Sequence, residues 1–303
     1  MTNKILITGG AGFIGSHLAE ALVSNGYNVI VIDDLSRGKY ENLNNIIDET
    51  EFIKGDITDF ELMEDLIKKS DVIFHLAALS RVIPAIENPE LCFKSNIAGT
   101  EIIARLCSRY CKKLFFSSSR EVYGSAKYIP VDENHPLYPE NPYGSSKVAG
   151  EKIIEAYSKC YDLNYVILRL ANVYGKRDYD RVIPIFLRNS LENKDLIVYG
   201  GEQILDFIHI QDVVEAFLGM FENRVNNLVV NIGSGKGCTL IELSKIFNKF
   251  TEKKVKIIIK EKRMGEVESY VANIDKAQKI IGWRPKTSLE KGIMELFTID
   301  WHE

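Results

Sequence analysis

The chain has 303 residues, a formal net charge of −4 and a calculated pI near 5.9. This length exceeds one typical domain, and an acidic balance without a basic stripe argues against nucleic acid as a partner. No apolar run approaches the length of a membrane span, and the five cysteines contain no Cys-x-x-Cys pair. We therefore expect a cytoplasmic protein with reduced thiols, no signal peptide, no membrane contact and no metal site.

The chain begins with a strand, a glycine-rich loop, a helix and a second strand. The strands and the helix are predicted at Lys4–Thr8, 16–24 and 28–32. Glycines in the loop at 9–15 let backbone N–H groups approach a pyrophosphate at the helix N-terminus, where the helix dipole favours anions. Asp33 follows the second strand, about 20 residues past the loop, where a carboxylate can accept hydrogen bonds from an adenosine ribose. This order predicts a dinucleotide-binding unit.

Strands and helices continue to alternate up to residue 172. Strands are predicted at 51–53, 72–76, 114–118 and 165–170, and helices at 62–69, 89–110 and 142–161. Such alternation is typical of an α/β fold with a doubly wound parallel sheet, the Rossmann architecture, with helices on both faces.

After residue 172 the elements become shorter and mixed. Helices are predicted at 183–192, 212–221 and 240–250 and twice near the end, and strands at 196–199, 207–210, 228–232 and 255–259. We predict a Rossmann domain over residues 1–172 and a smaller mixed α/β substrate-binding domain over residues 173–303. Residues 207–235 can pack back onto the first domain.

Two Tyr-x-x-x-Lys patterns occur, and their local sequence separates them. Asn141-Pro142 precedes Tyr143 as an N-cap with proline at the first helical position, so Lys147 shares a helix face with Tyr143, with Cβ atoms about 6 Å apart. The rival pattern at 123–127 runs towards Pro130, where a helix ends. A lysine ammonium near a phenol favours the phenolate and lowers its pKa from about 10. We therefore predict Tyr143 as the acid/base.

Motifs along the whole chain resemble those of the extended short-chain dehydrogenase/reductases. They are Thr8-Gly9-Gly10-Ala11-Gly12-Phe13-Ile14-Gly15, His75-Leu76-Ala77-Ala78, Asn96-Ile97-Ala98-Gly99-Thr100, Ser117-Ser118-Ser119 before Val122-Tyr123-Gly124, Tyr143-Gly144-Ser145-Ser146-Lys147, Arg169-Leu170-Ala171-Asn172-Val173-Tyr174-Gly175 and Gly282-Trp283-Arg284-Pro285. Within that family the chain is most similar to the NAD-dependent epimerases and dehydratases of nucleotide sugars, above all the UDP-hexose 4-epimerases.

The resemblance implies roles for individual residues. Tyr143 would be the acid/base, Lys147 would bind the nicotinamide ribose and tune the phenol, and Ser119 would hydrogen-bond the sugar hydroxyl. Ser118, which alternates with Ser119 along a strand, should point away from it. The residues implied to bind NAD are Gly9, Gly12, Phe13, Ile14, Gly15, Asp33, Asp56, Ile57, Ala77, Asn96, Tyr143 and Lys147. Those implied to contact the substrate are Ser119, Glu121, Asn172 and Arg263, the last two at its diphosphate.

One departure from the family pattern affects the diphosphate. Many relatives carry arginine immediately before Asp-Phe, where this chain has Leu205. An arginine makes bidentate contacts to phosphate, so its loss is serious for binding. Arg81, Arg177 and Arg181 are candidates to replace it.

A second departure is Arg120-Glu121 directly after Ser119. Dehydratases of the family often have Asp-Glu at this point, whereas epimerases usually have small or neutral residues. Glu121 is read either as an exposed loop acid or, less often, as a catalytic base. Arg120 is no proton donor at neutral pH.

The sequence therefore predicts an NAD-dependent nucleotide-sugar 4-epimerase that acts on a UDP-hexose, with or without an N-acetyl group, through a transient 4-keto sugar. Two alternatives stay open: a 4,6-dehydratase or decarboxylase of the same family, and a non-catalytic NAD-binding sensor or scaffold. The resemblance also implies a homodimer formed through the two long helices at 89–110 and 142–161.

Overall fold

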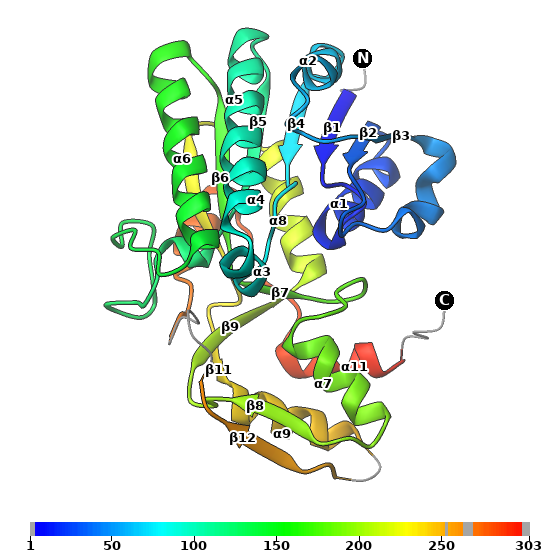
Figure 1. Ribbon diagram of the computed structural model, residues 1–303, viewed down its shortest axis with the longest axis vertical. Coiled ribbons are helices and arrows are strands. Elements are labelled where there is room, and N and C mark those ends of the chain that lie inside the picture. The colour runs from blue at the N-terminus through cyan, green and yellow to red at the C-terminus, as the bar shows by residue number, and fades with distance from the viewer. Residues whose placement is uncertain (1–3, 252–253, 263–268, 299–303) are drawn as a thin grey trace.

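A seven-stranded parallel sheet in the order β10-β6-β5-β4-β1-β2-β3 organises the computed structural model, which describes residues 4–251, 254–262 and 269–298 (Figure 1). The strands are β1 (Lys4–Thr8), β2 (Asn28–Asp33), β3 (Thr50–Lys54), β4 (Val72–His75), β5 (Lys113–Ser119), β6 (Tyr165–Leu170) and β10 (Leu228–Ile232). All six neighbouring pairs are parallel. The predicted doubly wound fold is confirmed.

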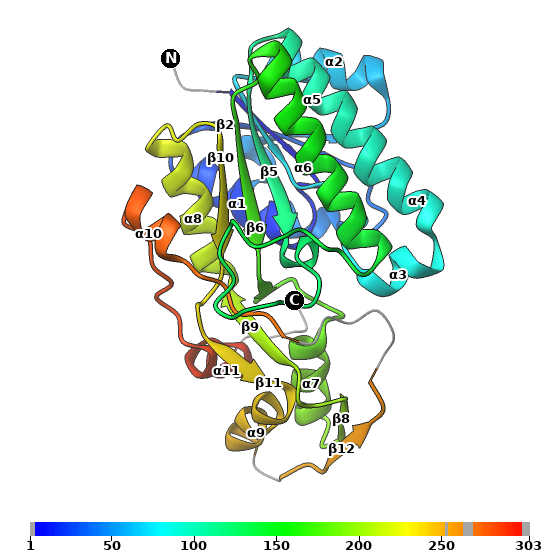
Figure 2. The same cartoon turned by 90° about the vertical axis from the view of Figure 1, so that its left-hand side faces the viewer.

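Helices cover both faces of this sheet, as Figure 2 shows. One face carries α1 (Phe13–Ser24), the 3₁₀ segment η1 (Tyr40–Glu49), α8 (Ile210–Glu222) and α10 (Asp275–Ile281); the other carries α2 (Phe60–Lys68), α5 (Gly99–Arg109) and α6 (Pro142–Tyr161). Alternate residues of β1 point into the two cores, Ile5 and Ile7 into one and Leu6 into the other. A strand buried on both faces explains its unbroken apolar run.

The helix predicted over 89–110 is interrupted. It consists of α4 (Pro89–Phe93), a π-helical turn at Lys94–Ala98 and α5, and a further helix, α3 (Val82–Glu87), precedes it. Asn88 caps α4 by accepting a hydrogen bond from the Leu91 N–H at 3.1 Å. A π turn inserts one extra residue per turn and is frequent at functional sites, and the apolar pattern alone did not indicate it.

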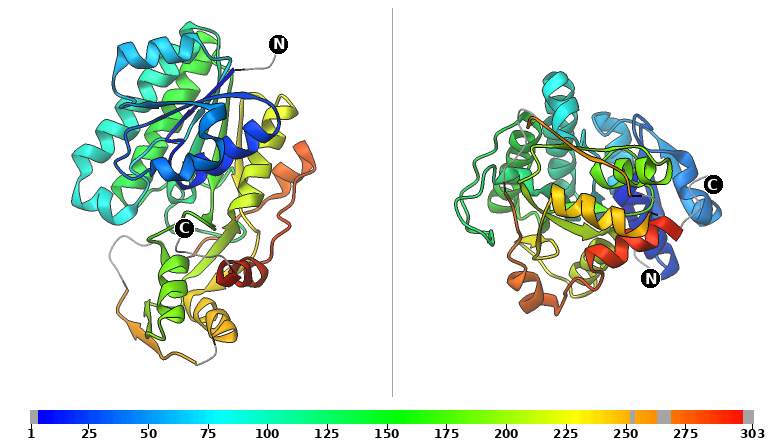
Figure 3. Two further views of the ribbon diagram at one scale, coloured as in Figure 1. Left: turned by 90° about the vertical axis from the view of Figure 1, so that its right-hand side faces the viewer. Right: turned by 90° about the horizontal axis from the view of Figure 1, so that it is seen from below.

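The remaining elements form a smaller part below the sheet, which Figure 3 shows from another side and from below. They are α7 (Val182–Leu191), α9 (Leu240–Phe250) and α11 (Leu289–Thr298), a parallel pair of β8 (Leu196–Tyr199) and β12 (Ile257–Lys260), and a three-stranded sheet of β11 (Gly237–Thr239), β9 (Ile204–His209) and β7 (Asn172–Tyr174). The three-residue strands β7 and β11 are too short to show a period in the sequence. Because β10 returns to pair with β6, the chain passes between the two parts more than once. The division at residue 172 stays a prediction.

One buried carboxylate joins three distant segments of the chain. Asp206, on β9, is fully buried and accepts hydrogen bonds from Ser234 N (2.7 Å), Ser234 Oγ (2.6 Å), Gly235 N (3.0 Å) and Ala272 N (3.1 Å). These bonds hold the loop after β10 and the segment at Ala272 against β9.

Candidate active site

A cleft of about 1020 Å³ lies at the carboxyl ends of the parallel strands, between the sheet and the smaller part. This is the edge at which open α/β sheets bind their ligands. The predicted site residues that line it are Gly9, Gly12, Phe13, Ile14, Gly15, Asp33, Asp56, Ile57, Ala77, Ser119, Glu121, Tyr143, Lys147 and Asn172. Arg263 lies outside the described residues.

The glycine-rich loop forms one wall of the cleft. Gly9 has φ +70°, which favours glycine, and a Cβ at Gly15 would lie 2.2 Å from the Gly9 carbonyl oxygen. The loop can therefore turn tightly and leave the N-terminus of α1 facing the cleft. At the tip of β2, Asp33 accepts hydrogen bonds from Ala11 N (3.0 Å) and Leu35 N (2.9 Å), which fix its carboxylate beside the loop. Both features suit a dinucleotide.

Asn96, also predicted to bind the cofactor, lies behind this wall. It is 2% exposed; its amide donates to Leu79 O (3.2 Å) and Ser146 Oγ (2.9 Å), and its carbonyl oxygen accepts from Leu79 N (2.8 Å). Asn96 is placed to support the loop after β4 and the helix α6.

Tyr143, Ser119 and Lys147 come together where β5 ends and α6 begins. Asn141 caps α6 by accepting from Gly144 N at 2.8 Å, which places Tyr143 in the first helical turn. Tyr143 lies near Ser119, the last residue of β5, whose hydroxyl acts to lower the pKa of the phenol. Ser119 Oγ also accepts from Glu121 N at 3.2 Å, so the hydroxyl proton is free for Tyr143 or a ligand.

Lys147 lies one turn further along α6, but it is not directed at the phenol. Its Nζ donates to the Ser117 carbonyl oxygen at 2.8 Å and lies 5.9 Å from the centre of the Tyr143 ring. Burial raises the pKa of Tyr143 to about 12, although the Ser119 hydrogen bond and the charge of Arg181 act in the opposite direction. The expected lowering of this pKa by lysine is therefore wrong, because loss of water around the phenol is the larger effect.

Tyr123, the tyrosine of the rival pattern, lies in the core instead. Its side chain is fully buried, and its hydroxyl donates to Asn231 Oδ1 at 2.7 Å and accepts from Arg169 Nη1 at 2.9 Å. Burial raises its pKa to about 12. Lys127 is exposed, so this pair has no access to a common ligand.

Glu121 differs from the exposed loop acid that was expected. It is 5% exposed; Oε1 lies 2.9 Å from Arg120 Nη2, and Oε2 accepts from Asn141 Nδ2 at 2.9 Å. Arg120 in turn donates through Nε to Asn172 Oδ1 at 3.2 Å. The Glu121 carboxylate thus supports Asn141, the cap of α6, and, through Arg120, the predicted substrate contact Asn172. Its burial results from segments that are distant in the sequence, so the neighbouring residues gave no sign of it.

The three arginines proposed to replace the one missing at Leu205 have different surroundings. Arg177 is bound to Glu20 through Nη1 (2.9 Å) and Nη2 (2.5 Å) and to Ser16 Oγ (3.2 Å). This bidentate ion pair holds the loop before α7 against α1. Arg177 therefore has a structural role and is a poor candidate to bind the diphosphate.

Arg81 and Arg181 face the cleft and share the buried carboxylate of Asp178, at 3.6 Å and 3.9 Å. Arg81 also pairs with Asp180, which lies 2.9 Å from Arg37. Among the described residues, Arg81 Nε is buried without a partner. The sequence did not identify Asp178 and Asp180 as part of the site. Charged residues in a solvated surface loop and charged residues in an ion-pair network have the same sequence pattern.

The residues that the structure describes contain no group of three or more His, Cys, Asp or Glu side chains arranged to hold a metal ion. No helix among them is long and apolar enough to span a bilayer.

The chain is similar to known proteins over most of its length. The model of the NAD dependent epimerase/dehydratase family matches residues 5–233. A Methanocaldococcus jannaschii protein with the provisional name UDP-glucose 4-epimerase is 40% identical over 305 residues, 98% of this chain and 97% of that protein. A UDP-N-acetyl-alpha-D-glucosaminuronate decarboxylase of Bacillus cytotoxicus is 32% identical over 317 residues, 99% of this chain and 98% of that protein. The crystal structure of Thermotoga maritima UDP-glucose 4-epimerase with UDP-glucose is 38% identical, with a TM-score of 0.92 over 96% of both chains.

Proposed function

This chain belongs to the NAD-dependent epimerase/dehydratase family, and from that premise we propose that it is a nucleotide-sugar 4-epimerase acting on a UDP-hexose such as UDP-glucose, UDP-galactose or their N-acetyl forms. The proposal rests on one observation: Ser119, Tyr143 and Lys147 line the same cleft. Arg120 also lines it, at the position where dehydratases of the family often have an acid. A non-catalytic sensor or scaffold has no need for this set.

The enzyme uses NAD, and the cleft fits that cofactor. The turn at Gly9 and Gly15 leaves room for a pyrophosphate, and Asp33 is fixed for the adenosine ribose. Lys147 would hold the nicotinamide ribose. NAD bound there would supply the acceptor for the hydride of the sugar C4 and, in its reduced form, the donor of the hydride to the other face.

Tyr143 is proposed to move the proton of the sugar 4-hydroxyl. With a pKa of about 12 it starts protonated in the free protein, whereas the oxidation step needs the phenolate as base. Ser119 and Arg181 are the groups that lower this pKa, and both line the cleft. Ser119 is also placed to hydrogen-bond the sugar oxygen as its charge changes. The 4-keto sugar then turns in the cleft before it is reduced.

The surroundings of Glu121 favour epimerisation over elimination. A dehydratase needs a base for the C5 proton and an acid for the leaving 6-hydroxyl. Both oxygens of Glu121 are already engaged, by Arg120 and Asn141, and a guanidinium with a pKa above about 12 donates no proton at neutral pH.

Incubation with a panel of UDP- and dTDP-sugars is expected to yield an epimer of unchanged mass, identified by NMR and mass spectrometry. Glu121→Gln should lower kcat less than about tenfold, because the amide can still accept from Asn141, whereas loss of a C5 base would cost about 100-fold or more. Loss of water or carbon dioxide from the preferred substrate would instead assign the enzyme to the dehydratases or decarboxylases.

NAD is expected to bind at least about tenfold more tightly than NADP, because a 2′-phosphate would approach the buried carboxylate of Asp33. Arg37, the nearby cation, is paired with Asp180. Titration of nucleotide-free protein measures the preference. Asp33→Asn should reduce it, while Asp65→Asn, at an exposed carboxylate that does not line the cleft, should leave it unchanged. Tighter binding of NADP by the unaltered protein would contradict the assignment.

A homodimer and a cytoplasmic location belong to the same proposal. The large apolar side chains Leu91, Phe93 and Tyr161, on α4 and α6, are 47%, 40% and 64% exposed. All five cysteines are free thiols, which agrees with a reducing compartment. Sedimentation at the mass of a monomer would contradict the dimer.

A further inference from the structure

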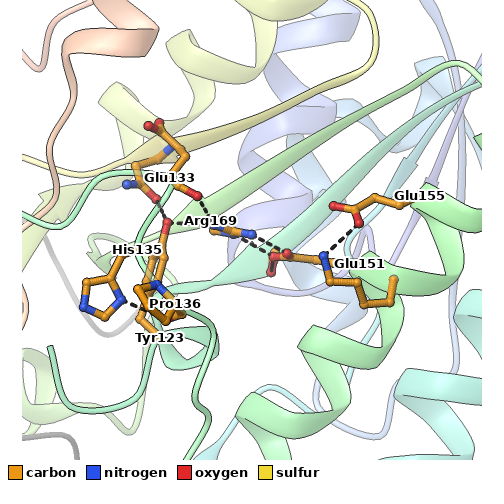
Figure 4. Close-up of polar contacts among 10 residues, drawn as sticks. Tyr123, Glu133, His135, Pro136, Glu151, Glu155 and Arg169 are labelled. Carbon is orange, nitrogen blue, oxygen red and sulfur yellow. Dashed lines mark hydrogen bonds and ion pairs between the residues drawn. The ribbon is translucent and has the colours of Figure 1, made fainter. Parts of the chain in front are cut away.

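A buried ion pair lies directly behind the candidate active site. Glu151, on α6, follows Lys147 by one helical turn and is fully buried, and Arg169, on β6, is 3% exposed. Arg169 Nη2 lies 2.6 Å from Glu151 Oε2 and Nε lies 3.0 Å from Oε1, a bidentate arrangement (Figure 4). Neither residue lines the cleft, so neither is available to a ligand there.

The same carboxylate also reaches β5. Ser118 Oγ donates to Glu151 Oε1 at 2.5 Å. Helix α6 is therefore tied to the end of β5 by two successive hydrogen bonds, from Lys147 to the Ser117 carbonyl and from Ser118 to Glu151. Next along β5 is Ser119, which lies near Tyr143 of the same helix, so these bonds adjoin the residues proposed for catalysis.

Arg169 makes two further hydrogen bonds, through Nη1, on the side away from Glu151. Nη1 donates to the hydroxyl of Tyr123 at 2.9 Å and to the carbonyl of Glu133 at 3.3 Å, and Tyr123 donates to Asn231 on β10. Figure 4 shows Arg169 between Tyr123 and Glu151. Tyr123, from the second Tyr-x-x-x-Lys pattern, thus helps to hold the Arg169 guanidinium in place.

Stability alone does not explain why two charges are kept in the core. Desolvation of a buried pair offsets much of its attraction, and two apolar residues of similar volume often serve the fold equally well. A bidentate pair does, however, fix the relative position of the two elements that carry it. Here those elements are α6, which carries Tyr143, and β6, whose neighbour β5 ends at Ser119.

We propose that Glu151 is a positioning residue: together with Arg169 it holds α6 in register with β5, through Ser118, so that Tyr143 and Ser119 meet. This inference rests on the proposed function. Its direct consequence is that loss of the pair displaces the phenol from the serine, and small displacements of reacting groups cost about 100-fold in rate.

Glu151→Gln is expected to lower kcat about 100-fold, with KM for the sugar nucleotide changed less than about threefold, since Glu151 touches no ligand. The melting temperature should also fall, because Arg169 loses its counter-charge. The matched control is Glu155→Gln on the same helix, which breaks only the partly exposed ion pair with Lys152 at 2.8 Å and should leave kcat and melting temperature near those of the unaltered protein.

The double variant Glu151→Met, Arg169→Met separates positioning from stability. Removal of both charges should restore most of the melting temperature, whereas kcat should stay low because the bonds from Glu151 to Ser118 on β5 and to Arg169 on β6 are gone. Recovery of kcat together with the melting temperature would overturn the proposal. Ser118→Ala, which changes no charge, provides a second test and should lower kcat about tenfold at nearly unchanged melting temperature; an unchanged kcat would count against the proposal.

A crystal structure of Glu151→Gln decides the matter independently of turnover. The distance between the hydroxyl oxygens of Tyr143 and Ser119 should increase, and an unmoved pair would overturn the inference. The panel of sugar nucleotides tests the proposed function on the unaltered protein, so failure of that function and failure of the positioning role are distinguishable.

Discussion

Tyr143→Phe is expected to lower kcat about 1000-fold while NAD still binds, because the substitution removes only the oxygen that carries the proton. The phenol lines the cleft near Ser119, at the carboxyl ends of the parallel strands, where it can exchange a proton with a bound sugar. Turnover of the preferred sugar nucleotide and titration with NAD measure the two effects separately.

Tyr123→Phe is the matched control for this loss. Its hydroxyl joins Arg169 to Asn231 in the core, so its removal should lower the free energy of unfolding by about 1–2 kcal/mol and kcat by less than about tenfold. Equal losses of kcat in the two variants would remove the support for Tyr143 as acid/base.

Asp206→Ala should lower the free energy of unfolding by about 4 kcal/mol and the melting temperature by roughly 10 °C. The carboxylate accepts four hydrogen bonds and is fully buried, so alanine would leave donors at Ser234, Gly235 and Ala272 without an acceptor. Denaturant unfolding measures the loss.

Asp65→Ala provides the comparison for Asp206→Ala. Asp65 also pairs closely, with Lys69 at 2.6 Å, but its side chain is 60% exposed, and such surface pairs contribute less than about 1 kcal/mol. A similar destabilisation in both variants would show that the buried cluster around Asp206 is not a centre of stability.

The parts of the site that the sequence predicts well depend on short-range order. The glycine-rich loop and Asp33 belong to one strand–loop–helix–strand unit, and the cap at Asn141 with its following proline sets the start of α6. Because such rules act within a few residues, the sequence predicts the parallel fold and the place of Tyr143 on a helix.

The ionisation of Tyr143 and the exposure of Glu121 could not be predicted in the same way. Both depend on how much water distant segments exclude, and that is decided when α6, β5 and the following loop close on one another. The sequence-based expectation considered only Lys147, the nearest charge along the helix, and so gave the wrong direction for the pKa of Tyr143.

By itself, the sequence determined that this chain forms a doubly wound parallel sheet with a dinucleotide loop, since apolar periodicity and glycine spacing are local properties. Only the tertiary structure decided which charges meet. Arg177 forms an ion pair with Glu20, 157 residues away, and Arg169 forms one with Glu151 on another element. A long polar side chain carries no local sign of its partner, because its contacts form only when the elements pack and the dielectric around them falls.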